Sequence, residues 1–354
     1  HKMFENEDGS DTFERYAKTG ASANAYTSAD RTVYLFSATE NFAPSLEILL
    51  DFVTHPYFTD KTVQKEQGII GQEIKMYDDN PDWQLYFGML NGLYVNNPVK
   101  IDIAGTKESI SQITAEMLFS CYDTFYNLSN MALAVAGKTT VEEVLEVADR
   151  LLEETEKVIV ERAFLPEPAD IVSDYVEENL PVATPVFAFG YKENHETAER
   201  SIDEEIAMLI ILEVLAGQMS PFYKKLLDDG LVNTSFSTEY FNGFNYAAPI
   251  FSGESVNPRE VCERIKNAVA ELKAKGVSEE EFEIVRKKQY GKTVRAFSDI
   301  DTVANGLITT HFAKDELFAE FNAVKNMELS FVNELLRKSF DESKAVLSVV
   351  CQKS

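Results

Sequence analysis

The stretch SANAYTSADRTVYLFS, residues 22–37, decides the fold class of this chain. Its two ends, residues 22–27 and 32–37, are rich in β-branched and aromatic residues, and a polar segment separates them. This pattern predicts two antiparallel strands joined by a short turn. A second hairpin is predicted at Asn242-Gly243, which lies between two aromatic-rich runs, because this dipeptide is a strong short-range turn signal.

Amphipathic helices are expected to follow each hairpin. Apolar residues recur at i, i+3, i+4 and i+7 from Leu46 to Val53, which is typical of a helix with one buried face. Ser278 and Glu281 have the spacing of a capping box at a helix start. Further helices are expected near residues 61–77, 83–94, 114–125, 141–153, 203–216, 221–229 and 258–275, and further strands near 131–136 and 186–191.

The order of these elements indicates an α+β fold used twice. Strands and helices occur in runs rather than in strict alternation. Residues 121–136 and 336–350 each contain a helix end, an aromatic residue, a serine turn and a β-rich run, which suggests a duplication. We expect two duplicated domains, residues 1–155 and 176–354, each a mostly antiparallel sheet layered with helices. Residues 156–175, which are rich in charge and contain two prolines, are expected to be the linker.

Composition limits the function. The chain of 354 residues has 33 basic and 59 acidic side chains, and a formal net charge of −26 repels nucleic-acid backbones. No apolar run approaches the roughly 18 residues of a membrane span. Cys121, Cys262 and Cys351 are too few and too scattered for a disulfide framework or a cysteine metal site. We therefore expect a cytoplasmic protein with no membrane span and no nucleic-acid partner.

Carboxylates and histidines are the remaining candidates for chemistry, because the sequence has no Gly-x-Ser-x-Gly elbow and no Gly-rich phosphate loop. Glu66 and Glu73 are seven residues apart in an expected helix, which places both on one face. Such carboxylates are either solvated, the ordinary outcome on a helix, or directed at a site. For His55, His195 and His311 ordinary packing or exposure is expected.

Several motifs together resemble the insulinase-like (pitrilysin) family of zinc peptidases, and in particular its bacterial processing-protease branch. The motifs are His1-Lys2-Met3-Phe4, the stretch from Gly20 to Ser28, Arg31-Thr32-Val33-Tyr34, and Glu66 with Glu73 in an Ile-Ile-Gly-Gln-Glu-Ile context. The resemblance covers the whole chain, and its most specific motifs lie in residues 1–137.

The resemblance implies a zinc site. The family signature is the inverted motif H-x-x-E-H, whose two histidines bind zinc and whose glutamate is the general base for the zinc-bound water that attacks the peptide. His1 corresponds to the last histidine, Glu73 to the distal glutamate ligand, and Glu66 to a further acidic residue that orients a ligand. The first histidine and the base would precede His1, together with one strand and the start of the motif helix. Since catalytic zinc needs three protein ligands, we expect the chain as given to bind zinc poorly and to be inactive, and the intact protein to be active.

The resemblance also implies how substrate and partner bind. A peptide would add as a strand to residues 22–27 inside a clamshell chamber, with Asn24 and Ala25 in contact, although small residues that fit a tight hairpin explain this pair equally well. Leu226 and Asn233 stand where many members carry a substrate-gripping Arg and Tyr. We therefore expect a heterodimer in which a homologous subunit supplies that pair.

The favoured interpretation is the zinc-binding subunit of a metalloendopeptidase. The alternative is a non-catalytic homologue that acts as a peptide-binding or structural subunit. A third hypothesis, an unrelated acidic scaffold, requires several accidental motif matches.

Overall fold

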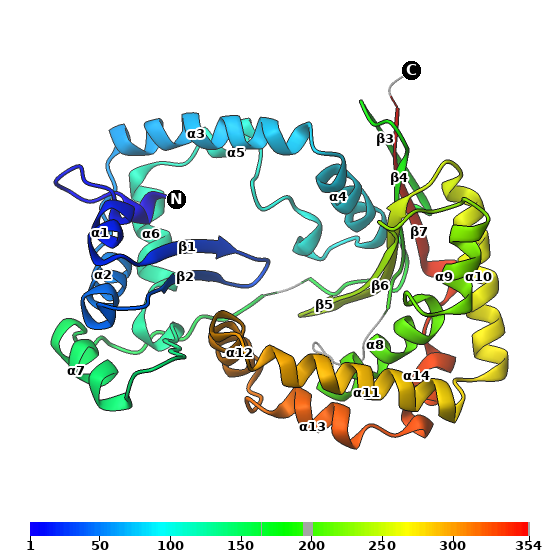
Figure 1. Cartoon of the computed structure of the whole chain (residues 1–354). Helices are drawn as coiled ribbons and strands as arrows, with labels where there is room; N and C mark the ends of the chain where they lie inside the picture. The colour runs from blue at the N-terminus through cyan, green and yellow to red at the C-terminus, as the bar shows by residue number, and fades with distance from the viewer. Residues whose placement is uncertain (164, 194–200, 353–354) are drawn as a thin grey trace. The chain divides into compact units, whose positions relative to one another are not determined.

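The computed structural model describes residues 1–163, 165–193 and 201–352 (Figure 1). Helices and strands occur in runs, which confirms the α+β class. The chain forms two compact units, and each is discontinuous in sequence. The first comprises His1–Lys75, Ile103–Ala163 and Asp299–Asp315, and the second comprises Met76–Asp102, Phe164–Ser298 and Glu316–Ser354.

These units differ from the continuous domains expected at residues 1–155 and 176–354. Met76–Asp102 belongs to the second unit because the helix in this segment packs on the sheet of that unit. Asp299–Asp315 belongs to the first unit because Asn305 of its helix accepts a hydrogen bond from the Tyr26 hydroxyl of the first hairpin. Tertiary packing, which local sequence patterns do not contain, decides both assignments. The duplication of the two halves stays a prediction.

The first unit contains the hairpin predicted at residues 22–37. β1 (Ser22–Thr27) pairs antiparallel with β2 (Thr32–Ser37) over their whole length, and Ser28 N donates to Arg31 O at 2.8 Å across the turn. The helices of this unit are α1 (Thr12–Thr19), α2 (Phe42–Thr54), most of α3 (Asp60–Asp78), α5 (Lys107–Ile110), α6 (Ala115–Phe125), α7 (Val141–Leu151) and α12 (Ile300–Ala313), with the 3₁₀ turns η1 (Lys2–Phe4) and η3 (Leu128–Asn130).

The core of the first unit forms around the apolar face of α2. Leu46 is fully buried, Val53 is 6% exposed, and both belong to one cluster with Tyr16 of α1 and Val147 of α7, as the spacing in α2 predicts.

The strand predicted at residues 131–136 is wrong. That segment has no strand assignment, and β1 and β2, the strands described in this unit, pair only with each other.

The second unit contains a five-stranded sheet in the order β3-β7-β4-β6-β5. Its strands are β3 (Tyr175–Leu180), β4 (Val186–Tyr191), β5 (Ser237–Gly243), β6 (Tyr246–Glu254) and β7 (Ala345–Gln352). β3 and β7 are parallel, and the other neighbours are antiparallel, which confirms a mostly antiparallel sheet.

The second hairpin is confirmed, but its turn lies two residues later than predicted. Asn242 and Gly243 end β5, where Gly243 pairs with Tyr246, and the turn consists of Phe244 and Asn245. Asn245 has a φ of 65°, which asparagine tolerates better than most residues. A Cβ at Gly243 would lie 2.2 Å from the Tyr246 hydroxyl oxygen, so the glycine serves this close approach rather than the turn.

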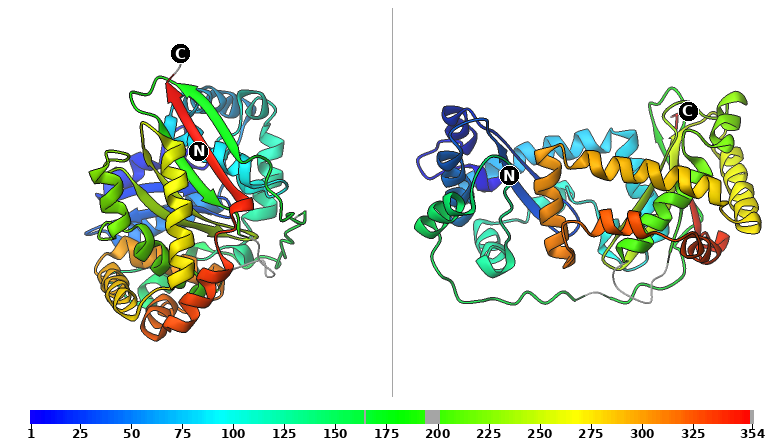
Figure 2. Two further views of the ribbon diagram at one scale, coloured as in Figure 1. Left: turned by 90° about the vertical axis from the view of Figure 1, so that its right-hand side faces the viewer. Right: turned by 60° about the horizontal axis from the view of Figure 1, so that its bottom comes forward.

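Helices cover both faces of this sheet (Figure 2). They are α4 (Pro81–Leu93) on one face and α8 (Ile202–Ala216), α9 (Pro221–Asp228), α10 (Pro258–Lys275), α11 (Glu279–Ala296), α13 (Ala319–Asn326) and α14 (Leu329–Lys338) in the layer of the other face, with the 3₁₀ turns η2 (Pro98–Lys100) and η4 (Glu342–Lys344) in the connections. Neighbouring residues of β7 alternate between the layers, since Val346 belongs to the α4 cluster and Leu347 to the opposite one.

α4 lies close to the sheet because two of its residues are glycines. A Cβ at Gly92 would lie 2.6 Å from Cγ1 of Val346, and one at Gly88 would lie 2.9 Å from Oγ of Ser348. The Ser348 hydroxyl donates to the carbonyl oxygen of Leu85 at 3.0 Å. The lack of side chains at these two positions therefore sets the distance between the layers.

Residues 166–173, here called the strap, are anchored to the second unit by Glu167. The backbone N–H groups of Val95, Asn96 and Asn97 donate to its carboxylate at 2.8, 2.7 and 2.6 Å, and Lys192 Nζ lies 2.5 Å away. The Lys192 and Glu167 side chains are 1% and 6% exposed. Burial raises the pKa of Glu167, but the hydrogen bonds from Lys192 and the three N–H groups outweigh burial and hold that pKa below its ordinary value.

In the described residues, no single helix is both long enough and apolar enough to span a bilayer. Only α8 and α9, taken together as one pair bent by 42°, have the required length and apolar character.

Candidate functional site

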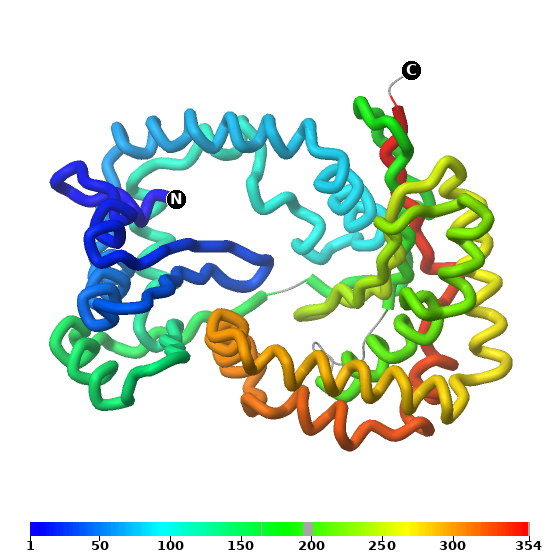
Figure 3. The backbone as a smooth tube through the Cα atoms, viewed as in Figure 1, coloured from blue at the N-terminus to red at the C-terminus, as the bar shows by residue number. Residues whose placement is uncertain are grey.

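The candidate site joins the first residue of the chain to α3 through side-chain contacts, and Figure 3 shows the N-terminal end of the backbone on the same side as this helix. Glu66 and Glu73 are two helical turns apart, so α3 presents both carboxylates on one face. His1 immediately precedes η1, and Met3 of that turn is buried in the core of the first unit. One helix and one short turn therefore bring together His1, Glu66 and Glu73, the residues that were predicted to share a site.

The imidazole ring of His1 reaches both carboxylates. Its Nδ1 atom lies 3.1 Å from Oε1 of Glu66, and its Nε2 atom lies 3.5 Å from Oε2 of Glu73. The side chains of His1, Glu66 and Glu73 are 53%, 17% and 30% exposed. Glu66 is thus the more enclosed carboxylate, and the ring nitrogen near Glu73 belongs to a half-exposed side chain that other ligands can approach.

The two contacts fit different roles toward zinc. Two ligand atoms on one tetrahedral zinc, each bonded at about 2.0–2.2 Å, are roughly 3.4 Å apart. The Nε2–Oε2 separation of 3.5 Å matches that spacing, so His1 and Glu73 could share one ion. A zinc-binding histidine ordinarily uses its other nitrogen to contact a carboxylate, and Glu66 occupies that position.

The donor set of these residues is incomplete for catalytic zinc. His1 and Glu73 provide two ligands, whereas catalytic zinc needs three protein ligands. In the ranges that the structure describes, no group of three or more His, Cys, Asp or Glu side chains is arranged to hold a metal ion. His55 and His311 are exposed, as expected, and His195 lies outside the described residues.

The β1 strand offers an edge in the first unit. β1 pairs with β2, and no third strand is described beside it. Asn24 is exposed, and its side-chain oxygen accepts a hydrogen bond from the backbone N–H of Ala25 at 2.8 Å. A peptide that added to this edge at Ala25 would therefore displace the Asn24 side chain.

Leu226 and Asn233, which were compared with the substrate-gripping Arg and Tyr of other family members, have structural roles. Leu226 is 1% exposed and belongs to the core of the second unit. The side-chain amide of Asn233 donates to Glu254 at 2.6 Å. Both side chains thus have structural contacts within the second unit, and the heterodimer stays a prediction.

One part of the site was missed at the sequence level. Lys2 is 7% exposed and pairs with Glu5, which also lies 4.0 Å from Lys65 beside Glu66. The sequence carried no signal for this pair, because the pair matters through the burial of Lys2, which only the structure shows.

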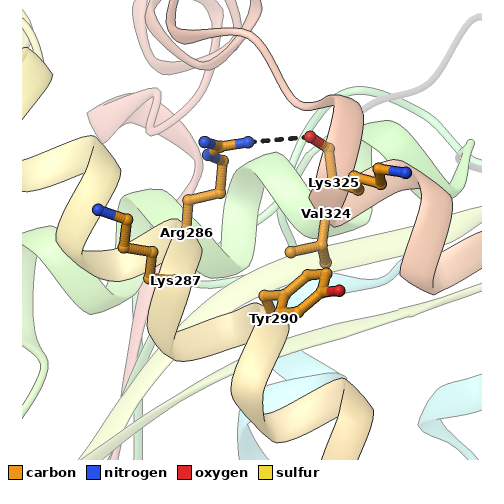
Figure 4. A pocket seen from close by; sticks show the side chains of 5 residues that line it. All are labelled: Arg286, Lys287, Tyr290, Val324 and Lys325. Atoms are coloured by element: carbon orange, nitrogen blue, oxygen red, sulfur yellow. Dashed lines mark hydrogen bonds between the residues drawn. The ribbon is translucent and has the colours of Figure 1, made fainter.

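A surface cavity of about 250 Å³ lies in the second unit between α11 and α13. It is lined by Arg286, Lys287, Tyr290, Val324 and Lys325. Figure 4 shows the Arg286 guanidinium donating to the carbonyl oxygen of Lys325, at 2.9 Å. None of the residues predicted for chemistry lines this cavity, so the cluster around His1 remains the candidate site.

Comparisons with known proteins show the family of the chain. Residues 2–107 match the family model described as insulinase (peptidase family M16), and residues 112–289 match the model described as peptidase M16 inactive domain. The whole chain is 36% identical to the uncharacterized zinc protease YmfH of Bacillus subtilis and covers 83% of that relative. A stretch of 136 residues, 38% of the chain, is 29% identical to a probable mitochondrial-processing peptidase subunit beta of Schizosaccharomyces pombe and covers 30% of it.

A solved structure has nearly the same backbone. The crystal structure of an M16-like peptidase from Alicyclobacillus acidocaldarius superimposes with a TM-score of 0.94 at 35% identity, over 100% of this chain and 85% of that chain.

Proposed function

Because the chain belongs to the insulinase (peptidase M16) family, we propose that it is the zinc-binding subunit of a metalloendopeptidase. The observation that carries this proposal is the His1 ring, whose two nitrogens face Glu66 and Glu73 at 3.1 and 3.5 Å. Its relatives include proteins named zinc proteases, which supports a peptidase lineage.

Zinc is the proposed metal, held by Nε2 of His1 and a carboxylate oxygen of Glu73. A histidine and the general-base glutamate of an H-x-x-E segment directly before His1 would complete the site. When bound, zinc polarises water and peptide carbonyls. Glu66 orients the His1 ring through Nδ1 and makes Nε2 a better electron donor.

The proposed substrate is a peptide held as an added strand at β1. Backbone hydrogen bonds from such an edge bind peptides with little dependence on their side chains. Ala25 N faces this edge, since it donates to its neighbour's side chain, and Asn24 is exposed beside it. A substrate N–H···O ladder would begin at this position.

A homologous partner subunit is proposed to complete the enzyme. The support is that Leu226, an uncharged residue, occupies the position compared with the substrate-gripping arginine. A cytoplasmic or otherwise reducing location is proposed as well, because Cys121, Cys262 and Cys351 are all free thiols.

The second candidate is a non-catalytic peptide-binding or structural subunit. Its support is that residues 112–289 match the family model described as peptidase M16 inactive domain.

The deciding experiment uses the full-length protein from its native cell. Its intact mass and N-terminal sequence show whether H-x-x-E precedes His1, and metal analysis then gives the zinc content. The proposal expects the motif, one zinc per chain, and peptide cleavage that rises when a homologous partner is added and disappears in Glu73→Gln. A chain without the upstream glutamate, or one without zinc, overturns catalysis and establishes the second candidate. Rapid cleavage with no partner present overturns the heterodimer.

A further inference from the structure

The turn that carries His1 is fixed to the first unit by two kinds of contact. The first kind is apolar: Met3 is 6% exposed, and Phe4 stacks on Phe13 with ring centroids 4.5 Å apart. The second kind is charged: Lys2, the first residue of the turn, pairs with Glu5, which follows the turn in an extended conformation. The apolar contacts hold the turn in the core, and Glu5 lies near Lys65 of α3.

Glu5 has two cationic neighbours. Lys2 Nζ donates to Oε2 of Glu5, and Lys2 is almost fully buried at 7% exposure. A buried ammonium is strongly unfavourable without a partner, so Lys2 depends on Glu5. Lys65 Nζ lies 4.0 Å from the same oxygen of Glu5, and Lys65 directly precedes Glu66 on α3. Glu5 therefore connects the turn of His1 to the helix that carries both carboxylates of the site.

We propose that Glu5 is a positioning residue that, by bridging Lys2 and Lys65, holds His1 in place against Glu66 and Glu73. This inference rests on the proposed zinc function, because the positioned ring is a proposed ligand. His1 is the residue before Lys2, so a displaced turn moves the ring directly. Metal–ligand distances tolerate only about 0.2 Å of error, which makes zinc binding sensitive to a small displacement.

The test compares charge-removing variants in the full-length protein. Glu5→Gln breaks the bridge, Lys65→Met removes only its α3 arm, and Lys61→Met is the matched control, an exposed lysine one turn earlier on the same helix. Lys2→Arg keeps the charge pair. Each variant is measured for zinc affinity by chelator competition, for the visible spectrum of the cobalt-substituted protein, and for thermal unfolding.

Glu5→Gln is expected to weaken zinc binding about 10- to 100-fold, as changes of groups behind metal ligands do, and to alter the cobalt spectrum. Lys65→Met is expected to change both in the same direction by less, because Lys65 is 66% exposed. Lys61→Met is expected to match the wild type, and Lys2→Arg, which keeps the positive charge, is expected to retain more zinc affinity than Glu5→Gln.

A Glu5→Gln protein that unfolds at lower temperature but keeps wild-type zinc affinity and cobalt spectrum overturns the proposal, because Glu5 is then purely structural. If Glu5→Gln does not fold, the double variant Lys2→Met, Glu5→Gln removes the unpaired ammonium, and wild-type zinc affinity in that protein overturns the proposal equally. A wild-type protein that binds no zinc overturns the proposed function itself, whereas unaffected variants of a zinc-binding wild type overturn only the role of Glu5.

Discussion

Nε2 of His1 lies 3.5 Å from Oε2 of Glu73, although the two residues are far apart in the sequence. This is the spacing of two ligands on one tetrahedral zinc. The same ring faces Glu66 through its other nitrogen. The two carboxylates should therefore affect zinc binding unequally.

Glu73→Gln and Glu66→Gln separate these two roles. In the full-length protein, Glu66→Gln is expected to weaken zinc binding about 10- to 100-fold, because Glu66 acts on zinc only through His1. Glu73→Gln should weaken it more, since a proposed ligand loses its charge. Chelator competition measures both affinities, with Asp78→Asn, an exposed carboxylate at the end of α3, as the control. An equal or larger effect of Glu66→Gln would reverse the assignment.

The packing of α4 predicts a stability effect at Gly92. A Cβ there would lie 2.6 Å from Val346, so Gly92→Ala is expected to cost about 1–3 kcal/mol of unfolding free energy through overpacking. Gly291→Ala is the control, because no atom lies within 4 Å of its added Cβ and alanine favours a helix by roughly 0.5–1 kcal/mol over glycine. Chemical denaturation measures both, and a Gly92→Ala protein as stable as wild type contradicts the close packing.

The strap predicts loss of stability in acid. The folded-state pKa of Glu167 lies below its ordinary value, so its stabilising contribution is present above the unfolded pKa of about 4.5 and disappears as the pH falls through the lower folded value. Glu167→Gln should reduce this acid dependence. It should also cost about 3 kcal/mol at neutral pH, because the buried Lys192 ammonium loses its paired carboxylate and keeps only the carbonyl oxygen of Asp170. Denaturation curves at several pH values measure both effects. Glu161→Gln, at an exposed position, should leave the wild-type profile unchanged.

The thiols should differ in reactivity. Burial raises the pKa of Cys262 to about 12, so only about one thiol in 10⁴ is ionised at pH 8. Cys121 is exposed. In the native protein, iodoacetamide should alkylate Cys121 first and leave Cys262 unmodified, and denaturant should expose all three cysteines, as mass spectrometry of peptides can show. Native alkylation of Cys262 at the rate of Cys121 would contradict the buried position.

The net charge of −26 predicts a preference for basic peptides. If acidic side chains attract the substrate of the proposed enzyme, cleavage of Lys- and Arg-rich peptides should weaken with added salt more than cleavage of neutral ones. The comparison of kcat/KM for the two peptide classes between low and physiological salt measures this. Equal salt responses would remove the electrostatic preference.

Local patterns in the sequence were sufficient where neighbouring residues decide the structure. The hairpin at residues 22–37 and the capping box of Ser278 and Glu281 are present as predicted, because turn and cap geometry depend on residues a few positions apart. The turn predicted at Asn242-Gly243 moved by two residues because contact with Tyr246, rather than turn geometry, requires the glycine.

Long-range packing was beyond these patterns. The pairing of β3 with β7, the position of α4 on the sheet and the anchoring of Glu167 all join distant residues. For the site, helical spacing placed Glu66 and Glu73 on one face but did not indicate what they face, and the family resemblance supplied His1. The Lys2–Glu5 bridge was visible only once the burial of Lys2 was known.

The parallel pairing of β3 with β7 has a consequence during synthesis on the ribosome. Tyr175 pairs with Leu347, and the strap and β4 are made long before β7 exists. At about 5–20 residues per second, β3 waits roughly 9–34 s for its partner. During that interval the edges of β3 and β4 that β7 will cover are open to other chains. Newly made chains should therefore be the most aggregation-prone form of this protein, and chaperone binding should concentrate on nascent chains that end before residue 345.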